Sequence, residues 1–183
     1  MCILEDGSSN GNCGAISGDT FRSGTFDMWS LLGRIFILKR KEENMYRLTT
    51  EHSFDAAHFL AGYEGKCGNL HGHRWRVLVE VEGEALKAQG QMRGMLVDFG
   101  DVKQVVKEMT DAFDHSFIYE EGSLKQKTLE ALLEEEFLMI SVAFRPTAEN
   151  FAKYFYEEME KQGYPVAKVT VYETPNNCAS YYK

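Results

Sequence analysis

One alternating run constrains the fold of this chain more than any other feature of its sequence. Between residues 74 and 82 the apolar side chains occupy every second position, namely Trp75, Val77, Val79 and Val81. Charged side chains fill most of the positions between them, and Leu78 is the one exception. A period of two residues is typical of a β-strand with one face in the core. The alternation extends back to His71 and His73, so we expect both imidazoles on the buried face.

A third histidine changes the interpretation of this pair. Residues 46–60 also alternate, and one face of that predicted strand carries Leu48, Thr50, His52, Phe54, Ala56 and His58. Glycines at 62, 65 and 68 suit a hairpin-like return that brings His58 beside His71 and His73. Three inward histidines without an obvious fourth protein ligand are typical of a catalytic zinc site that keeps one position open. The alternative is that paired histidines on a strand are hydrogen-bonded core or surface groups.

Length and charge exclude several classes of protein. The chain has 183 residues, which is enough for one domain with a substantial core. Its net charge is −8, with 28 acidic and 20 basic residues, so we expect no nucleic-acid or anionic-membrane surface. The four cysteines lack the spacing of a disulfide framework, and no secretory signal or membrane-spanning run is evident. We therefore expect a cytoplasmic protein.

The first 44 residues differ from the rest. Residues 1–26 are rich in Gly, Ser, Asn and Thr and show no sustained period, which indicates disorder. Lys41-Glu42-Glu43-Asn44 must be encoded by purine-rich codons immediately before Met45, as a bacterial ribosome-binding site would be. We therefore expect residues 1–44 to be a disordered extension or untranslated sequence read as protein, and residues 45–183 to be the domain.

The remainder of the chain predicts helices alternating with strands. Apolar residues at helical spacing indicate a helix over residues 101–113, capped by Asp98 or Asp101. A surface helix is expected from about residue 127 to 136, and a strand or extended segment over 137–144. Thr147 is a good N-cap for a core-facing helix that ends at Gly163. A final strand over 168–173 ends before Pro175.

Two motifs resemble a known family. Phe54-Asp55-Ala56-Ala57-His58, and Cys67 placed just before His71-Gly72-His73, resemble the 6-pyruvoyltetrahydropterin synthase superfamily, and the resemblance covers residues 45–183. The Cys-x-x-x-His-Gly-His spacing is similar to the 6-carboxytetrahydropterin synthases of queuosine biosynthesis. The resemblance implies an α+β tunnelling fold, an antiparallel sheet with helices packed on one face. It also implies that subunits close their sheets into a barrel, typically as a homohexamer made of two trimers.

The resemblance also implies roles for individual residues. It makes Cys67 the general base, although a cysteine can equally be a small buried apolar residue. It makes His115 a proton relay that Asp114 orients. It makes Glu173 the main pterin anchor, supported by Thr147 and Glu149. A strand-end glutamate can simply face water, and Glu149 can simply favour the helix dipole.

Other candidate residues have weaker assignments. Lys66, Arg74 and Arg76 are candidates for meeting a triphosphate, although the two arginines have the parity of solvent-facing strand residues. His52 falls outside the motifs, so we assign it to packing or to hydrogen bonding behind the ligands.

The activity implied is a zinc-dependent carbon–carbon lyase, 6-carboxytetrahydropterin synthase. Its substrate would be 7,8-dihydroneopterin triphosphate and its products 6-carboxy-5,6,7,8-tetrahydropterin, acetaldehyde and triphosphate. Two alternatives stay open: a 6-pyruvoyltetrahydropterin synthase, and a non-catalytic homologue that only binds zinc or pterin.

Overall fold

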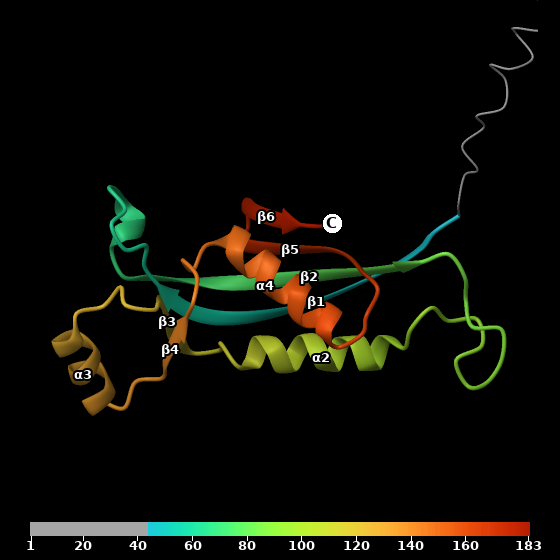
Figure 1. Cartoon of the computed structure of the whole chain (residues 1–183), viewed down its shortest axis with the longest axis horizontal. Helices are drawn as coiled ribbons and strands as arrows, with labels where there is room; N and C mark the ends of the chain where they lie inside the picture. Colours follow the sequence, from blue (N-terminus) through green and yellow to red (C-terminus); the bar gives the residue numbers. More distant parts are fainter. Residues whose placement is uncertain (1–43) are drawn as a thin grey trace, which may run out of the picture. The chain divides into compact units, whose positions relative to one another are not determined.

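A six-stranded sheet forms the framework of the domain (Figure 1), in a computed structural model that describes residues 44–183. The predictions for the leader fall almost entirely outside these described residues. In the strand order β4-β3-β1-β2-β5-β6, the central pair is β1 (Tyr46–His58) and β2 (His71–Gly83). The other strands are β3 (Ser116–Glu120), β4 (Met139–Val142), β5 (Val166–Thr174) and β6 (Asn177–Tyr181).

Three α-helices and one short turn complete the described chain. They are α2 (Phe99–Asp111), α3 (Gln126–Glu134), α4 (Ala148–Lys161) and the 3₁₀ turn η1 (Lys66–Gly68). The Asp98 side chain accepts a hydrogen bond from the Gly100 N–H, so α2 starts two residues earlier than predicted. Thr147 caps α4 as expected, and Gly163 follows its end with a positive φ of 85°.

Strand pairing agrees with the predicted α+β class and differs in one respect. β1 with β2, β2 with β5, and β5 with β6 are antiparallel, as predicted. However, β3 lies parallel to β1 and β4 lies parallel to β3, so the sheet is mixed rather than wholly antiparallel. The sequence pattern missed β3 and β6. Both are only five residues long, and β6 is mostly polar, so neither shows a sustained alternation.

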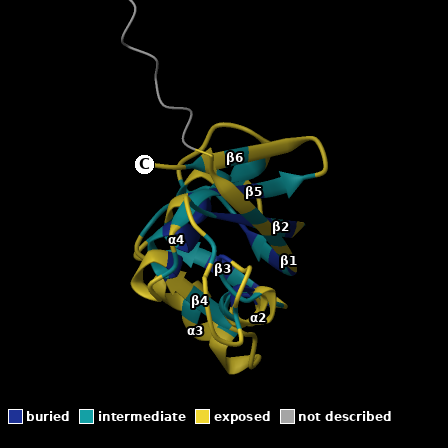
Figure 2. Ribbon diagram, turned by 90° about the vertical axis from the view of Figure 1, so that its right-hand side faces the viewer, coloured by how far each residue is buried: buried dark blue, intermediate teal, exposed yellow. Residues whose placement is uncertain are grey.

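The core lies between one face of the sheet and the helices α2 and α4 (Figure 2). The alternating residues of β2 are buried there as predicted, with Trp75, Val77 and Val79 fully buried. They meet an aromatic layer from α4, in which Phe151 and Phe155 are also fully buried. The alternating β2 residues and the aromatic residues of α4 form one close-packed core. This packing fixes the position of β1 and β2 in the sheet.

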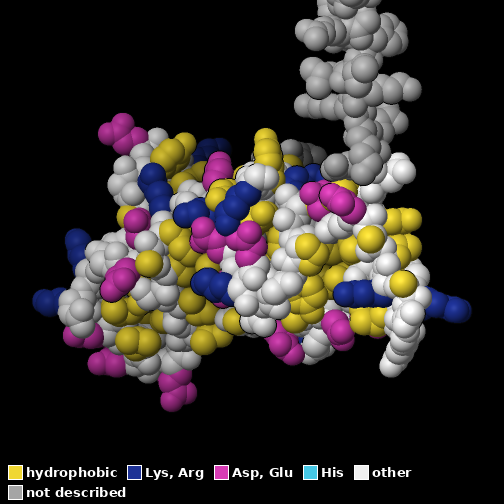
Figure 3. Space-filling view, turned by 45° about the vertical axis from the view of Figure 1, so that its right-hand side comes forward, with side chains coloured by type: hydrophobic (Ala, Val, Ile, Leu, Met, Phe, Trp, Pro, Cys, Tyr) yellow, Lys and Arg dark blue, Asp and Glu magenta, His cyan; other side chains and the backbone are white. Residues whose placement is uncertain are grey.

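The surface mixes both signs of charge. On the face shown in Figure 3, Lys and Arg side chains lie among Asp and Glu side chains and apolar groups. The described surface includes cross-strand ion pairs, such as Arg47 with Glu82 at 2.7 Å and Lys168 with Glu80 at 2.5 Å.

Among the described residues, 44–183, the helices are all too short or too polar to cross a lipid bilayer.

The aromatic layer gives a test of this core. Phe155→Ala removes a fully buried ring from α4, and we expect the free energy of unfolding to fall by about 3–5 kcal/mol because a cavity replaces packed atoms. Urea denaturation at fixed protein concentration measures it. Lys153→Ala, at an exposed position of the same helix, should change stability by no more than about 0.5 kcal/mol. Equal losses in the two variants would contradict the core described here.

Candidate active site

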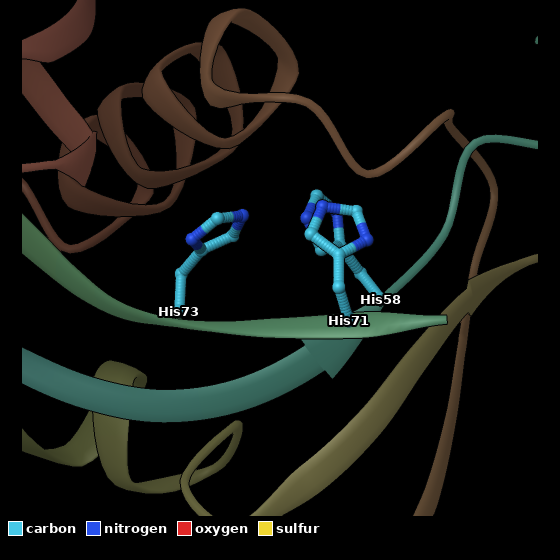
Figure 4. Close-up of side chains that lie close together, drawn as sticks. All are labelled: His58, His71 and His73. Atoms are coloured by element: carbon cyan, nitrogen blue, oxygen red, sulfur yellow. The ribbon is translucent and has the colours of Figure 1, made fainter. Parts of the chain in front are cut away.

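Three histidines meet at the end of the central hairpin (Figure 4). His58, the last residue of β1, lies directly opposite His71, the first residue of β2, and His73 follows one pleat later on the same face. The ring centroids are 4.4 Å apart for His58 and His71, 5.2 Å for His58 and His73, and 4.9 Å for His71 and His73. One ring nitrogen from each histidine lies within 4.8 Å of the others. The structure thus brings together the three predicted ligands.

Backbone carbonyls orient two of these rings. The Nδ1 atom of His58 lies 2.7 Å from the carbonyl oxygen of Pro146, and Nδ1 of His71 lies 2.8 Å from that of Asn69. A neutral imidazole that donates from Nδ1 keeps the lone pair on Nε2 for a metal, and metal-binding histidines characteristically have such a partner. The Nε2 atoms of His58 and His73 are buried and have no hydrogen-bond partner in the described structure.

Burial favours the neutral form of the His58 and His73 imidazoles. It lowers the pKa of His58 to about 4, with a smaller lowering from the neighbouring imidazoles. Burial is also the main cause that lowers the pKa of His73. A neutral ring is the form that binds a metal ion. Buried, unpaired Nε2 atoms on His58 and His73, grouped with a ring nitrogen of His71, therefore fit a divalent cation such as zinc, with three protein ligands.

Cys67 sits in a tight turn between the two central strands. Its carbonyl accepts a hydrogen bond of 2.8 Å from the Leu60 N–H, which closes the loop. A Cβ atom at Gly68 would lie 2.6 Å from the backbone oxygen of Tyr63, so this turn requires glycine at that position. The Cys67 side chain is half-buried and lines a hollow of about 270 Å³.

The predicted pterin-binding residues share that hollow. Its walls include Thr147, Glu149 and Glu173 as well as Cys67. The Oε1 atom of Glu173 lies 3.6 Å from Nε2 of His58 and 3.8 Å from Nε2 of His73. Glu173 therefore connects the histidine cluster to the hollow. Thr147 uses its hydroxyl to accept from the Asn150 N–H at 3.4 Å, so that group serves as the helix cap as well.

Asp114 and His115 lie in the turn between α2 and β3. The Oδ2 atom of Asp114 is 2.8 Å from Nδ1 of His115, as expected for an orienting carboxylate, and the His115 side chain is 81% exposed. His115 lines a hollow with Asp55, Arg74 and the rim of His73. This hollow shares none of its lining residues with the hollow at Cys67, so the two predicted catalytic groups do not line the same hollow in one chain.

The three basic candidates differ in their freedom to meet a phosphate. Arg74 already makes two hydrogen bonds to Asp55, at 3.0 and 2.6 Å. Arg76 stacks on Tyr172 with its guanidinium carbon 4.1 Å from the ring centroid. Lys66 is exposed in η1 and forms no ion pair with any of the described residues. His52 bonds to the Thr110 hydroxyl at 2.8 Å, which agrees with its predicted packing role.

Sequence reasoning missed the groups that support the site. The Pro146 carbonyl comes from a segment 88 residues away from His58, and no pattern indicates such a contact. The Asp55–Arg74 pair had a usable signal. Its members have opposite charge and the same outward parity on strands whose hairpin register was already implied by the histidines.

Comparison with known proteins identifies the family. The profile of 6-pyruvoyl tetrahydropterin synthase matches residues 47–183. The chain belongs to the 6-pyruvoyl tetrahydropterin synthase family. Among its curated relatives, the 6-carboxy-5,6,7,8-tetrahydropterin synthase of Haemophilus influenzae is 34% identical over 140 residues, 75% of this chain and 99% of the relative. The Synechocystis protein of the same name is 31% identical and is covered over 94% of its length, with 75% of this chain.

Solved structures show the same fold. An uncharacterised protein of Wolinella succinogenes superposes with a TM-score of 0.62 at 22% identity, covering 76% of this chain and 99% of that one. The 6-pyruvoyl tetrahydropterin synthase of Plasmodium vivax superposes with a TM-score of 0.56 at 20% identity, covering 76% and 98%. These matches confirm the predicted fold of the family.

The ligand assignment gives the second prediction. His71→Ala removes one of three proposed ligands, so we expect the purified protein to lose most of its zinc, measured by inductively coupled plasma mass spectrometry. His52→Ala is the matched control, because His52 shares the β1 face with His58 and bonds to Thr110 instead. That variant should keep its metal. A fully metallated His71→Ala protein would refute the assignment.

Proposed function

We propose that this protein is a zinc-dependent 6-carboxy-5,6,7,8-tetrahydropterin synthase of queuosine biosynthesis. Its substrate is 7,8-dihydroneopterin triphosphate, and it releases acetaldehyde and triphosphate. The observation that carries the proposal is the link through Glu173, which joins a cluster of three histidines to a hollow lined by a cysteine. Family membership and relatives that bear this name support it.

Each residue has a role that follows from its position. His58, His71 and His73 would hold the ion, which would lower the pKa of a bound hydroxyl and polarise a neighbouring carbonyl. Glu173 presents two carboxylate oxygens side by side to the ring N–H and amino group of a pterin. Thr147 and Glu149 add contacts from the start of α4 in the same hollow.

Two groups move protons in this proposal. Cys67, as a thiolate, takes a proton from the substrate side chain, because it lines the hollow that Glu173 joins to the histidines. His115 gives or takes a proton, and Asp114 holds its Nδ1 side at 2.8 Å, which leaves Nε2 facing outward to reach substrate. Since Cys67 and His115 line different hollows of one chain, we propose that the complete site combines groups from neighbouring subunits.

The proposed assembly is a homohexamer formed by two trimers. β4 and β6 are the outermost strands of the described sheet, and pairing them between subunits would remove open edges. The acidic net charge and the absence of a disulfide pattern support a cytoplasmic enzyme whose partner is a small pterin rather than a nucleic acid or a membrane.

A 6-pyruvoyltetrahydropterin synthase is the runner-up within the same fold. The short spacing from Cys67 to His71 favours the carboxy branch, as do the names of the relatives. A homologue that only binds pterin would need neither Cys67 nor the Asp114–His115 pair.

Product identification tests the function directly. Purified protein of known zinc content is given 7,8-dihydroneopterin triphosphate, and the products are analysed by mass spectrometry. We expect 6-carboxy-5,6,7,8-tetrahydropterin, acetaldehyde and triphosphate. Formation of 6-pyruvoyltetrahydropterin alone would favour the runner-up, and an unchanged substrate with a loaded metal would favour a binding protein.

The role of the thiol gives the fourth prediction. Cys67→Ala should keep its zinc and lose turnover by about 10²-fold or more, because the general base is gone while the imidazoles remain. Cys178→Ala is the matched control, since Cys178 is a second thiol at the same hollow, and it should retain most of the rate. Steady-state kinetics with parallel metal analysis measures both variants. Full activity in Cys67→Ala would remove it as the base.

A further inference from the structure

The main chain of Asp55 holds both members of the Asp114–His115 pair. Its N–H donates to Oδ1 of Asp114 at 2.8 Å, and its carbonyl accepts from the His115 N–H at 2.7 Å. His115 has a φ of 55°, which an ordinary residue adopts only when its surroundings hold it there. These two hydrogen bonds supply that constraint. They fix the pair to β1, three residues before His58.

The side chain of Asp55 is held in turn by Arg74. The two residues are direct neighbours in the β1–β2 register, and the guanidinium forms a two-pronged contact, with Nε 3.0 Å from Oδ1 and one terminal nitrogen 2.6 Å from Oδ2. The side chains are 74% exposed for Arg74 and 41% for Asp55. An ion pair this exposed contributes little to stability. Stability therefore does not account for this two-pronged ion pair, and we looked for a role in the neighbouring site.

The charges around His115 suggest that role. Asp114 comes from its own turn, Asp55 from β1, and Arg74 from β2, where His73 forms the rim of the same hollow. The hydrogen bond from Arg74 is the main cause that lowers the pKa of Asp55, and the charge of Asp114 opposes it. The pKa of Asp114 is lowered chiefly by the Asp55 N–H. Two carboxylates and one guanidinium thus lie near His115, of which Asp114 contacts the imidazole and Asp55 and Arg74 line the same hollow.

We propose that the Asp55–Arg74 ion pair is a positioning and charge-setting device for Asp114 and His115. Arg74 cancels the charge of Asp55, so that Asp114 is the one uncompensated carboxylate beside His115. The effect on turnover rests on the function proposed above, whereas the electrostatic arrangement does not.

Opposite shifts in two single variants test the device. Arg74→Gln leaves two uncompensated carboxylates beside His115, which stabilises the imidazolium, so its pKa should rise by about 0.3–0.5 unit. Asp55→Asn leaves Arg74 uncompensated and keeps the main-chain contacts, so the pKa should fall by about the same amount. The double variant should return to the wild-type value, and Arg74→Lys, which keeps the charge, should stay near it.

The measurement is an NMR titration of the zinc-loaded protein with selectively labelled histidine, and the His115 signal is assigned with His115→Asn. Only five histidines contribute signals. Arg47→Gln is the control, because Arg47 makes a similar cross-strand ion pair near the other end of β1. It should leave the His115 titration unchanged. Single-variant shifts of the same sign, or no shift in either, would overturn the proposal.

The pH profile of kcat separates this inference from the proposed function. If His115 relays a proton in turnover, one limb of the kcat–pH profile reports its ionisation. The pKa read from that limb should then shift in each variant by the same amount as the pKa measured by NMR, while the zinc content stays constant. NMR shifts without a matching movement of the limb would remove His115 from the reaction and leave the charge-setting device in place. Unchanged NMR titrations would reject the device whatever the activity.

Discussion

The register of β1 against β2 is the constraint on which the rest of the site depends. Because His58 lies opposite His71, and Ala56 opposite His73, three imidazoles share one face at the end of the hairpin. A slip of one residue would turn every side chain of one strand to the other face, separating His58 from its partners and exposing Phe54. The hydrophobic core prevents that slip. Burial of Trp75 and Val77 thus maintains the geometry of the histidines.

The same register places the groups on both faces of the sheet. On the inward face it aligns the histidines, and Glu173 reaches them from β5. On the outward face it aligns Asp55 with Arg74, while the Asp55 main chain holds the turn that carries His115. The histidine cluster and the turn that carries His115 are therefore both positioned by the hydrogen bonds between β1 and β2. They are nevertheless directed to different hollows, and this separation is the reason for proposing that the complete site combines groups from neighbouring subunits.

Much of this arrangement could be predicted from periodicity. Alternation identified β1 and β2, and the glycines between them implied the hairpin that brings His58 to His71. Helical spacing identified α2 and α4; Thr147 was the predicted cap of α4, and of the two candidates for α2, Asp98 and Asp101, the structure has Asp98. The sequence did not reveal β3, because its pairing with β1 is parallel and bridges 60 positions from Ala56 to Ser116. Nor did it reveal the Pro146 carbonyl behind His58, since contacts between distant segments leave no local period.

The turn that carries Cys67 has a consequence for how such enzymes diversify. The hydrogen-bonded register of β1 and β2 ends at His58 and His71, so the thiol lies outside the ladder in a loop closed by one backbone hydrogen bond. Residues can be added to or removed from this loop without shifting the histidine ligands. A change in the length of this loop thus moves the Cys67 sulfur relative to the three histidines, and so changes which atom of a bound substrate the thiol can reach.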